Sequence, residues 1–137
     1  MQRIGFIALV GIGLTACGED PPLCPPERAF RQGTLSGAAC NGSPLTYENF
    51  GRRFMQDYCT SCHSSAQKGE EARHCAPDES NMDTLDEIME LRDYIEERAA
   101  AGPNGVNDEM PPSGAKPTEE ERRDLGVWLA CEEDRLP

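Results

Sequence analysis

The chain has 137 residues, of which 13 are Lys or Arg and 25 are Asp or Glu, so its formal net charge at pH 7 is −12. This length suits one modest domain. So acidic a composition disfavours nucleic acid as a partner, because phosphate binding needs basic patches, whereas a protein with a basic docking surface would be attracted. The hydrophobic fraction of 37% and the aromatic fraction of 6% indicate a thin core, which needs covalent or cofactor cross-links for stability.

The first 16 residues have the features of an export signal. A short positive region containing Arg3 precedes an uncharged apolar run over residues 4–14, which is too short to span a bilayer as a mature helix. The run leads into Leu-Thr-Ala before Cys17, which resembles a bacterial lipobox. We therefore expect residues 1–16 to be removed, Cys17 to carry lipid, and the protein to face the periplasm or the cell surface from its membrane anchor. An ordinary secretory signal that leaves a plain cysteine is the alternative.

Residues 17–42 are rich in proline, glycine and small residues and show no hydrophobic periodicity. We expect this segment to be a tether, extended around its prolines, that holds the folded part off the membrane. The folded domain is then expected to cover residues 43–137.

Seven cysteines are present. Lipidation uses Cys17, two others form a short motif described below, and the remaining four are disulfide candidates: Cys24, Cys40, Cys75 and Cys131. Four cysteines allow three pairings, and the sequence alone does not decide among them. We favour Cys24–Cys40, which is local, and Cys75–Cys131, which would join the loop after the motif to the last helix.

The first helix is predicted from residue 43 to about residue 59. Ser43 has the character of an N-cap, and Pro44 suits the first helical position. Aromatic residues recur on one face at helical spacing, which indicates a stripe facing the core: Tyr47, Phe50, Phe54 and Tyr58.

The segment Cys59-Thr60-Ser61-Cys62-His63 at the end of this helix permits three interpretations. A structural zinc site needs four ligands, commonly two such cysteine pairs, and no second pair has suitable spacing. A redox dithiol works at a helix N-terminus beside a βαβ pattern, whereas this pair follows a helix. Cys-x-x-Cys-His is also the attachment pattern of c-type haem, in which both thiols bond to the haem and the histidine binds iron. Export favours this third interpretation, because haem attachment occurs outside the cytosol.

The rest of the chain predicts two more helices and two long loops. Residues 64–82 lack periodicity and are expected to be a loop. A capping box at Thr84 to Glu87 opens a helix that reaches about residue 101, and a second box at Thr118 to Glu121 opens the last helix, which ends at about residues 131–133. No strand alternation is present, so the predicted fold is all-α, with three main helices and long loops.

The loop over residues 102–117 supplies a candidate for the second axial iron ligand. Met110 is followed by two prolines, which fix the backbone after it. Four other residues are weaker candidates, because they lie on a helix, lack the prolines or follow the motif too closely: Met55, Met89, Met82 and His74.

Three features together resemble a small class I cytochrome c over about residues 43–133: Cys59-Thr60-Ser61-Cys62-His63, Met110-Pro111-Pro112 and a final helix with Trp128-Leu129. The resemblance implies that the first and last helices cross near a right angle and pack small and aromatic residues. Four residues fit that role by resemblance: Phe50, Phe54, Gly126 and Trp128. The resemblance also implies one covalent haem c between the Cys-x-x-Cys-His segment and the Met110 loop.

Ligation by His63 and Met110 would leave no open position on the iron, and a thioether ligand raises the reduction potential. The expected function is therefore that of an electron carrier for redox protein partners, rather than of an enzyme. Two alternatives remain at this stage. One is a haem protein in which Met110 dissociates and the iron reacts with peroxide or senses a gas. The other is a lipoprotein without haem, cross-linked by disulfides.

Overall fold

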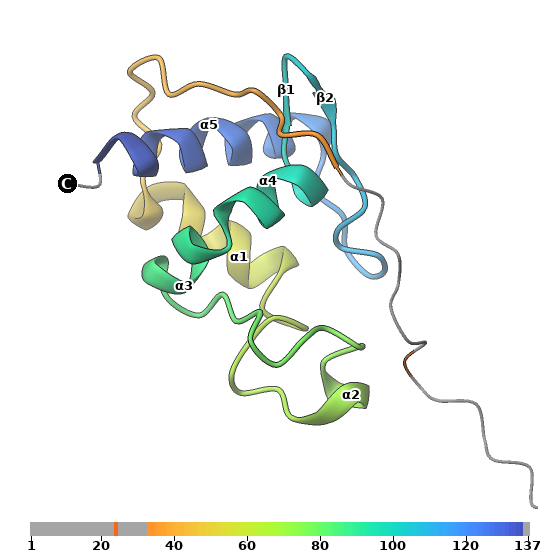
Figure 1. Cartoon of the computed structure of the whole chain (residues 1–137). Helices are drawn as coiled ribbons and strands as arrows, with labels where there is room; N and C mark the ends of the chain where they lie inside the picture. The colour runs from red at the N-terminus through yellow and green to blue at the C-terminus, as the bar shows by residue number, and fades with distance from the viewer. Residues whose placement is uncertain (1–23, 25–32, 136–137) are drawn as a thin grey trace, which may run out of the picture.

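The structure is a computed structural model that describes Cys24 and residues 33–135. The expected signal segment 1–16 and the expected lipid site Cys17 lie outside the described residues. The described part is mostly helical, with one short hairpin beside the last helix (Figure 1). No helix in this part is both long and apolar enough to cross a membrane.

The first helical segment begins later than predicted. It consists of a π-helical turn, η1 (Tyr47–Gly51), continued by α1 (Arg52–Tyr58). Thr46 is the N-cap, because its side chain accepts a hydrogen bond from the Asn49 N–H (3.2 Å) while the Asn49 side chain accepts from the Thr46 N–H (2.7 Å). Ser43 has no such reciprocal partner, and its hydroxyl accepts only a local bond from the Leu45 N–H.

The second predicted helix is two helices. The capping box between Thr84 and Glu87 is confirmed. It opens α3 (Leu85–Glu90), and after a break at Leu91 the chain continues as α4 (Arg92–Ala99). The loop before α3 also contains one short helix that was not predicted, α2 (Gly69–Ala72).

The last helix is α5 (Glu119–Arg135), and its capping box is confirmed by mutual bonds between Thr118 and Glu121. Between α4 and α5, β1 (Ala101–Gly102) pairs antiparallel with β2 (Gly105–Val106). Strands of this length are too short to produce an alternating pattern, so the sequence did not indicate them.

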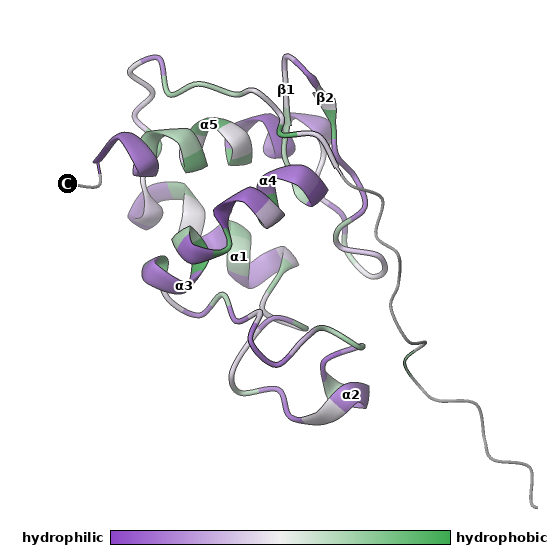
Figure 2. Cartoon of the chain, in the orientation of Figure 1, coloured by the Kyte–Doolittle hydropathy of each residue, from purple (hydrophilic) through white to green (hydrophobic). Residues whose placement is uncertain are grey.

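The hydrophobic core is formed by residues of α1, α3, α4 and α5, and η1 packs against α5 beside it. Figure 2 shows the middle of α5 as hydrophobic and α4 as largely hydrophilic. Trp128 is fully buried, and the Phe50 ring packs edge-on to it, with a centroid distance of 6.0 Å. A Cβ on Gly51 would lie only 2.2 Å from the Trp128 ring, so the helices approach closely at this glycine. The expected packing of small and aromatic residues is therefore present.

Gly126 does not take the role that we expected at this crossing. A Cβ added to Gly126 would meet the Ala101 carbonyl and the Ala38 side chain, each at 2.9 Å, and not the first helix. Residues two apart on a helix do not share a face, so Gly126 and Trp128 point to different neighbours. Gly51 is the small residue at the crossing.

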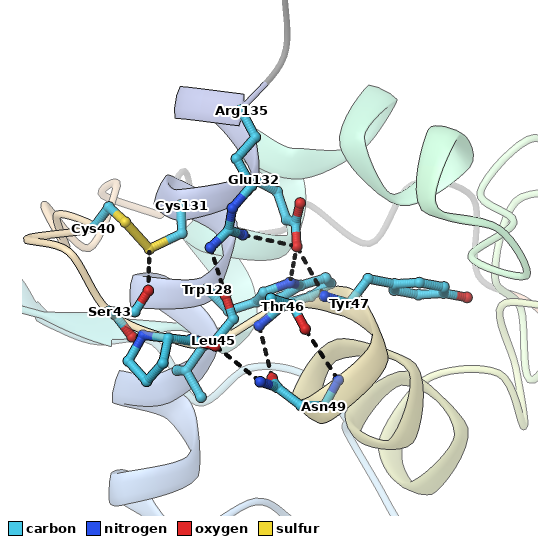
Figure 3. The surroundings of a disulfide bond; sticks show 11 residues. Cys40, Ser43, Leu45, Thr46, Tyr47, Asn49, Trp128, Cys131, Glu132 and Arg135 are labelled. Atoms are coloured by element: carbon cyan, nitrogen blue, oxygen red, sulfur yellow. Dashed lines mark hydrogen bonds and ion pairs between the residues drawn. A yellow bond between two sulfur atoms is a disulfide. The ribbon is translucent and has the colours of Figure 1, made fainter.

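The buried carboxylate of Glu132 joins the start of η1 to the end of α5 (Figure 3). It accepts hydrogen bonds from the Tyr47 N–H (2.8 Å) and from Trp128 Nε1 (3.0 Å), and it pairs with Arg135. A buried carboxylate is tolerated when it is paired and hydrogen-bonded in this way.

The segment 33–42, expected to be part of a tether, packs against the helical body instead. Ser36 is buried and its hydroxyl donates to Glu96 Oε1 (2.7 Å). The Asn104 N–H donates to the Ser36 carbonyl (2.9 Å), and Asn107 Nδ2 donates to the Thr34 carbonyl (2.8 Å). The folded part therefore begins before residue 43.

The favoured disulfide pairing was wrong. The structure pairs Cys24 with Cys75 and Cys40 with Cys131. The physical reason is the packed course of residues 33–42, which runs along β1 and α5 and brings Cys40 to the C-terminal half of α5. Nearness in sequence was a poor guide, because this course is fixed by contacts with residues 96–107.

Candidate functional site

The Cys-x-x-Cys-His segment forms a tight turn directly after α1. The Cys59 N–H donates to the Met55 carbonyl (2.8 Å), and the His63 N–H donates to the Cys59 carbonyl (2.9 Å). Among the described cysteines, Cys59 and Cys62 are the free ones, and the other four form the two disulfides. The two motif thiols are therefore available for bonding to a cofactor.

The surroundings of Cys59 do not favour thiol redox chemistry. Burial of its thiol raises the pKa of Cys59 to about 12, although the Arg122 charge acts in the opposite direction. Cys59 also follows the C-terminal end of α1, where the helix dipole disfavours a negative charge. A reactive dithiol needs an attacking thiol with a lowered pKa, so Cys59 lacks the property on which the redox interpretation depends.

The proton on His63 can be assigned from its partners. Nδ1 lies 2.9 Å from the Ser80 carbonyl oxygen and 2.9 Å from Ser80 Oγ. Because a carbonyl can only accept, Nδ1 carries the proton and Nε2 keeps its lone pair. Burial lowers the pKa of His63, against a smaller raising effect of the bond to the Ser80 backbone. A neutral imidazole with a free Nε2 is the form that binds a metal.

Arg73 organises the loop between the motif and α3. Its side chain is buried and donates hydrogen bonds within this loop, from Nη1 to the Ser64 carbonyl (2.7 Å), from Nη1 to Asn81 Oδ1 (3.0 Å) and from Nε to the Ala76 carbonyl (3.1 Å). Sequence reasoning missed Arg73 and Ser80. A loop without periodicity carries no signal for which polar side chain is buried, and the only available indication was a lone arginine close after the motif.

A second buried arginine holds the loop that contains Met110. Nη1 of Arg122, on α5, donates to the Met110 carbonyl (2.9 Å) and the Ala99 carbonyl (2.8 Å). The Met110 N–H in turn donates to the Arg98 carbonyl (2.9 Å). Met110 and Cys59 both pack, partly buried, against the same hydrophobic core. The structure therefore brings Cys59 and the Met110 loop to one core, and the Arg122 side chain that binds the Met110 carbonyl is near enough for its charge to act on Cys59.

The competing axial ligands are placed differently. Met55 and Met82 are buried in the hydrophobic core, at 2% and 9% exposure. Met89 packs against the core from α3, and His74 is exposed. Met110 differs from these candidates in two ways. Hydrogen bonds at its N–H and at its carbonyl fix its backbone, and it lies in the loop before α5.

The zinc interpretation also lacks support. In the part of the chain that the structure describes, no three His, Cys, Asp or Glu side chains gather as a metal site would require. Cys75 lies near the motif in the sequence, but its sulfur is already used in a disulfide. The donor set that remains, two free thiols followed by a neutral imidazole, fits covalent haem.

The structure combines a helical fold, a free Cys-x-x-Cys-His segment and a methionine loop that is held by hydrogen bonds. Together these features define the class of small c-type haem proteins. The cytochrome c family model matches residues 50–130, which is more than half of the chain. The chain belongs to the cytochrome c family, and this membership supports a c-type haem cofactor and a role in electron transfer. Comparison with curated proteins and with solved structures found no match.

Proposed function

We propose that this protein is a membrane-tethered electron carrier with one covalently bound haem c. Cys59 and Cys62 would form the thioether bonds, and His63 and Met110 would be the axial ligands. The observation that carries the proposal is the state of the cysteines: of those described, only the motif pair is free. One motif of this kind supports one haem.

Haem c supplies an iron centre that exchanges single electrons. The residues of the chain hold and orient the ligands for it: Ser80 fixes the Nδ1 proton of His63, and Arg122 fixes the backbone of Met110. Two protein ligands leave no position for a substrate on the iron. We therefore propose electron transfer between redox proteins, without substrate turnover.

The partner and the location are part of the same proposal. The formal net charge of −12 supports a redox partner with a basic docking surface. The N-terminal pattern supports export and a lipid on Cys17, with the domain facing the periplasm or the cell surface. Replacement of Cys17 by Ser should abolish incorporation of labelled fatty acid and release the protein from membranes, and unchanged membrane retention would contradict the anchor.

The first experiment is to express the full chain with a cytochrome c maturation system and to purify it. We expect haem that stays with the protein on denaturation, a c-type reduced-minus-oxidised spectrum and a one-electron redox titration. A chain without haem would instead establish the disulfide-linked lipoprotein. The Cys59→Ser/Cys62→Ser variant, which should lose covalent haem, is the control for attachment at this motif.

Separate experiments test the second axial ligand and the expectation that the iron has no open coordination position. Met110→Ala should lower the reduction potential and change the ligand spectrum, because a thioether ligand stabilises ferrous iron. An unchanged potential would contradict the assignment of Met110. Reduced wild-type protein should bind carbon monoxide slowly or not at all, whereas rapid binding would favour the reactive or gas-sensing alternative.

A further inference from the structure

The Ser80 side chain gives His63 a second hydrogen-bond acceptor. The backbone carbonyl of Ser80 and its Oγ each lie 2.9 Å from Nδ1 of His63. One residue therefore offers two oxygens to a single N–H group. The carbonyl is available whatever residue occupies position 80, whereas the hydroxyl is specific to serine or threonine.

The direction of the hydroxyl bond follows from its other partner. Ser80 Oγ donates to the Pro77 carbonyl oxygen (2.7 Å), which can only accept. A hydroxyl has one proton, so Ser80 has none left to donate to His63 and must accept from Nδ1–H. The side chain is thus oriented with its lone pairs toward the imidazole.

One buried guanidinium holds both ends of this interaction. Arg73 binds the carbonyl of Ser64, the residue after His63, and the side chain of Asn81, the residue after Ser80. It also donates to the Pro77 carbonyl, the same oxygen that orients the Ser80 hydroxyl. At 2% exposure, Arg73 is removed from competing water. The distance between His63 and Ser80 is therefore set by a network of the loop itself.

We propose that Ser80 is a positioning residue for His63 that lowers the reduction potential of the bound haem; this inference rests on the proposed function. Two acceptors draw the Nδ1 proton more strongly than one, which makes Nε2 a stronger electron donor to iron. A stronger donor favours the ferric state and so lowers the potential. Ser80 would then act against Met110, whose thioether raises the potential.

The test compares three variants of the full-length haem-loaded protein. Ser80→Ala removes the hydroxyl and keeps the carbonyl, Ser80→Thr restores a hydroxyl, and Ser113→Ala is a control at an exposed serine in the Met110 loop. For Ser80→Ala, we expect the ferrous-to-ferric ratio at a fixed potential to rise about threefold, which equals ~30 mV at 59 mV per tenfold change. Exchange of the Nδ1 proton with solvent, followed by NMR in the ferrous protein, should become severalfold faster.

The outcomes separate this inference from the proposed function. A raised potential with faster proton exchange in Ser80→Ala, both reversed in Ser80→Thr, supports it. Full haem content with a potential and an exchange rate equal to those of Ser113→Ala overturns it and leaves the carrier proposal intact. Absence of covalent haem from the wild-type protein overturns the proposed function, and this inference with it.

Discussion

The loop that follows the candidate ligand His63 and the loop that contains the candidate ligand Met110 are each held by a buried arginine, but the two arginines come from different places. In the loop over residues 64–82, Arg73 comes from the loop and binds the loop. In the loop over residues 102–117, the arginine is Arg122, which reaches in from α5. Only the first loop also has a disulfide, Cys24–Cys75.

The difference shows two ways of keeping irregular backbone in place. Buried carbonyls without helix or sheet partners need donors, and a guanidinium supplies several from one residue. The loop over residues 64–82 supplies its own donor, Arg73, and its disulfide ties it to Cys24. The Met110 loop depends on the position of α5. Disturbing α5 should therefore affect the Met110 side first.

The largest expected effect is that of Arg122→Met. It leaves the buried carbonyl of Ala99 and the partly buried carbonyls of Asn107 and Met110 without this donor. We expect a loss of about 3 kcal/mol of unfolding free energy, measured by urea denaturation. The spectral signature of the proposed bond between Met110 and the haem iron should also weaken. Arg123→Met, at the exposed neighbouring position, should change the unfolding free energy by less than about 0.5 kcal/mol. Equal effects of the two variants would contradict the role of Arg122.

Arg73→Met should cost less, about 2 kcal/mol, because Cys24–Cys75 and the bond from the Met82 N–H to the His63 carbonyl still restrain the loop. Methionine ligation should persist, whereas the potential should change through His63. Lys68→Met, in the same loop and exposed, is the matched control. If Arg73→Met destabilises the protein more than Arg122→Met with the disulfide intact, the contrast between the two loops is wrong.

Gly51→Ala tests the helix crossing that positions both loops. The helix that leads into His63 and the helix that carries Arg122 meet at Gly51 and Trp128, and a Cβ at Gly51 would lie 2.2 Å from the buried indole. We expect a loss of about 1–2 kcal/mol of unfolding free energy, measured by urea denaturation. The spectral features of both proposed iron ligands should change together. Gln56→Ala, on the exposed side of α1, should not reproduce it. A stable variant with a normal spectrum would show that the crossing can adjust.

The smallest effect should come from Met82→Leu. Met82 is a buried core residue, and a Met-to-Leu exchange of similar volume typically costs less than about 1.5 kcal/mol. The haem spectrum and the potential should stay at wild-type values. A lost methionine ligand in this variant would move the axial assignment from Met110 to Met82.

Local sequence signals predicted the fold best where they were self-contained. The boxes at Thr84 to Glu87 and at Thr118 to Glu121 open α3 and α5 as expected, because each box completes its own hydrogen bonds within four residues. The first helical segment begins at Tyr47 instead of near Ser43, because the side chain that completes the cap, at Thr46, is Asn49. Cys59, Cys62 and His63 could be predicted as haem-binding residues because that chemistry depends on fixed spacing.

Features that depend on distant contacts were not predictable in this way. The pairing of Cys40 with Cys131 follows from the course of residues 33–42 over α5, which no local pattern encodes. No local pattern marks Arg73 or Arg122 as buried, because the carbonyls that they satisfy come from irregular segments. Gly126 was assigned to the wrong neighbour, since the sequence shows which residues are small but not which face they occupy.

The Cys24–Cys75 disulfide would limit how far the domain can move from the proposed lipid anchor. Only residues 18–23 separate Cys17 from Cys24 in the sequence. With lipid on Cys17, as proposed, the chain from Cys17 to Cys24 would reach at most roughly 25 Å, whereas without the disulfide the chain from Cys17 to residue 33 could reach roughly 55 Å. The disulfide would thus shorten the distance that the domain can reach from the membrane, and it would turn one side of the domain toward the lipid headgroups. Such a carrier would meet its donors and acceptors at the membrane that holds it.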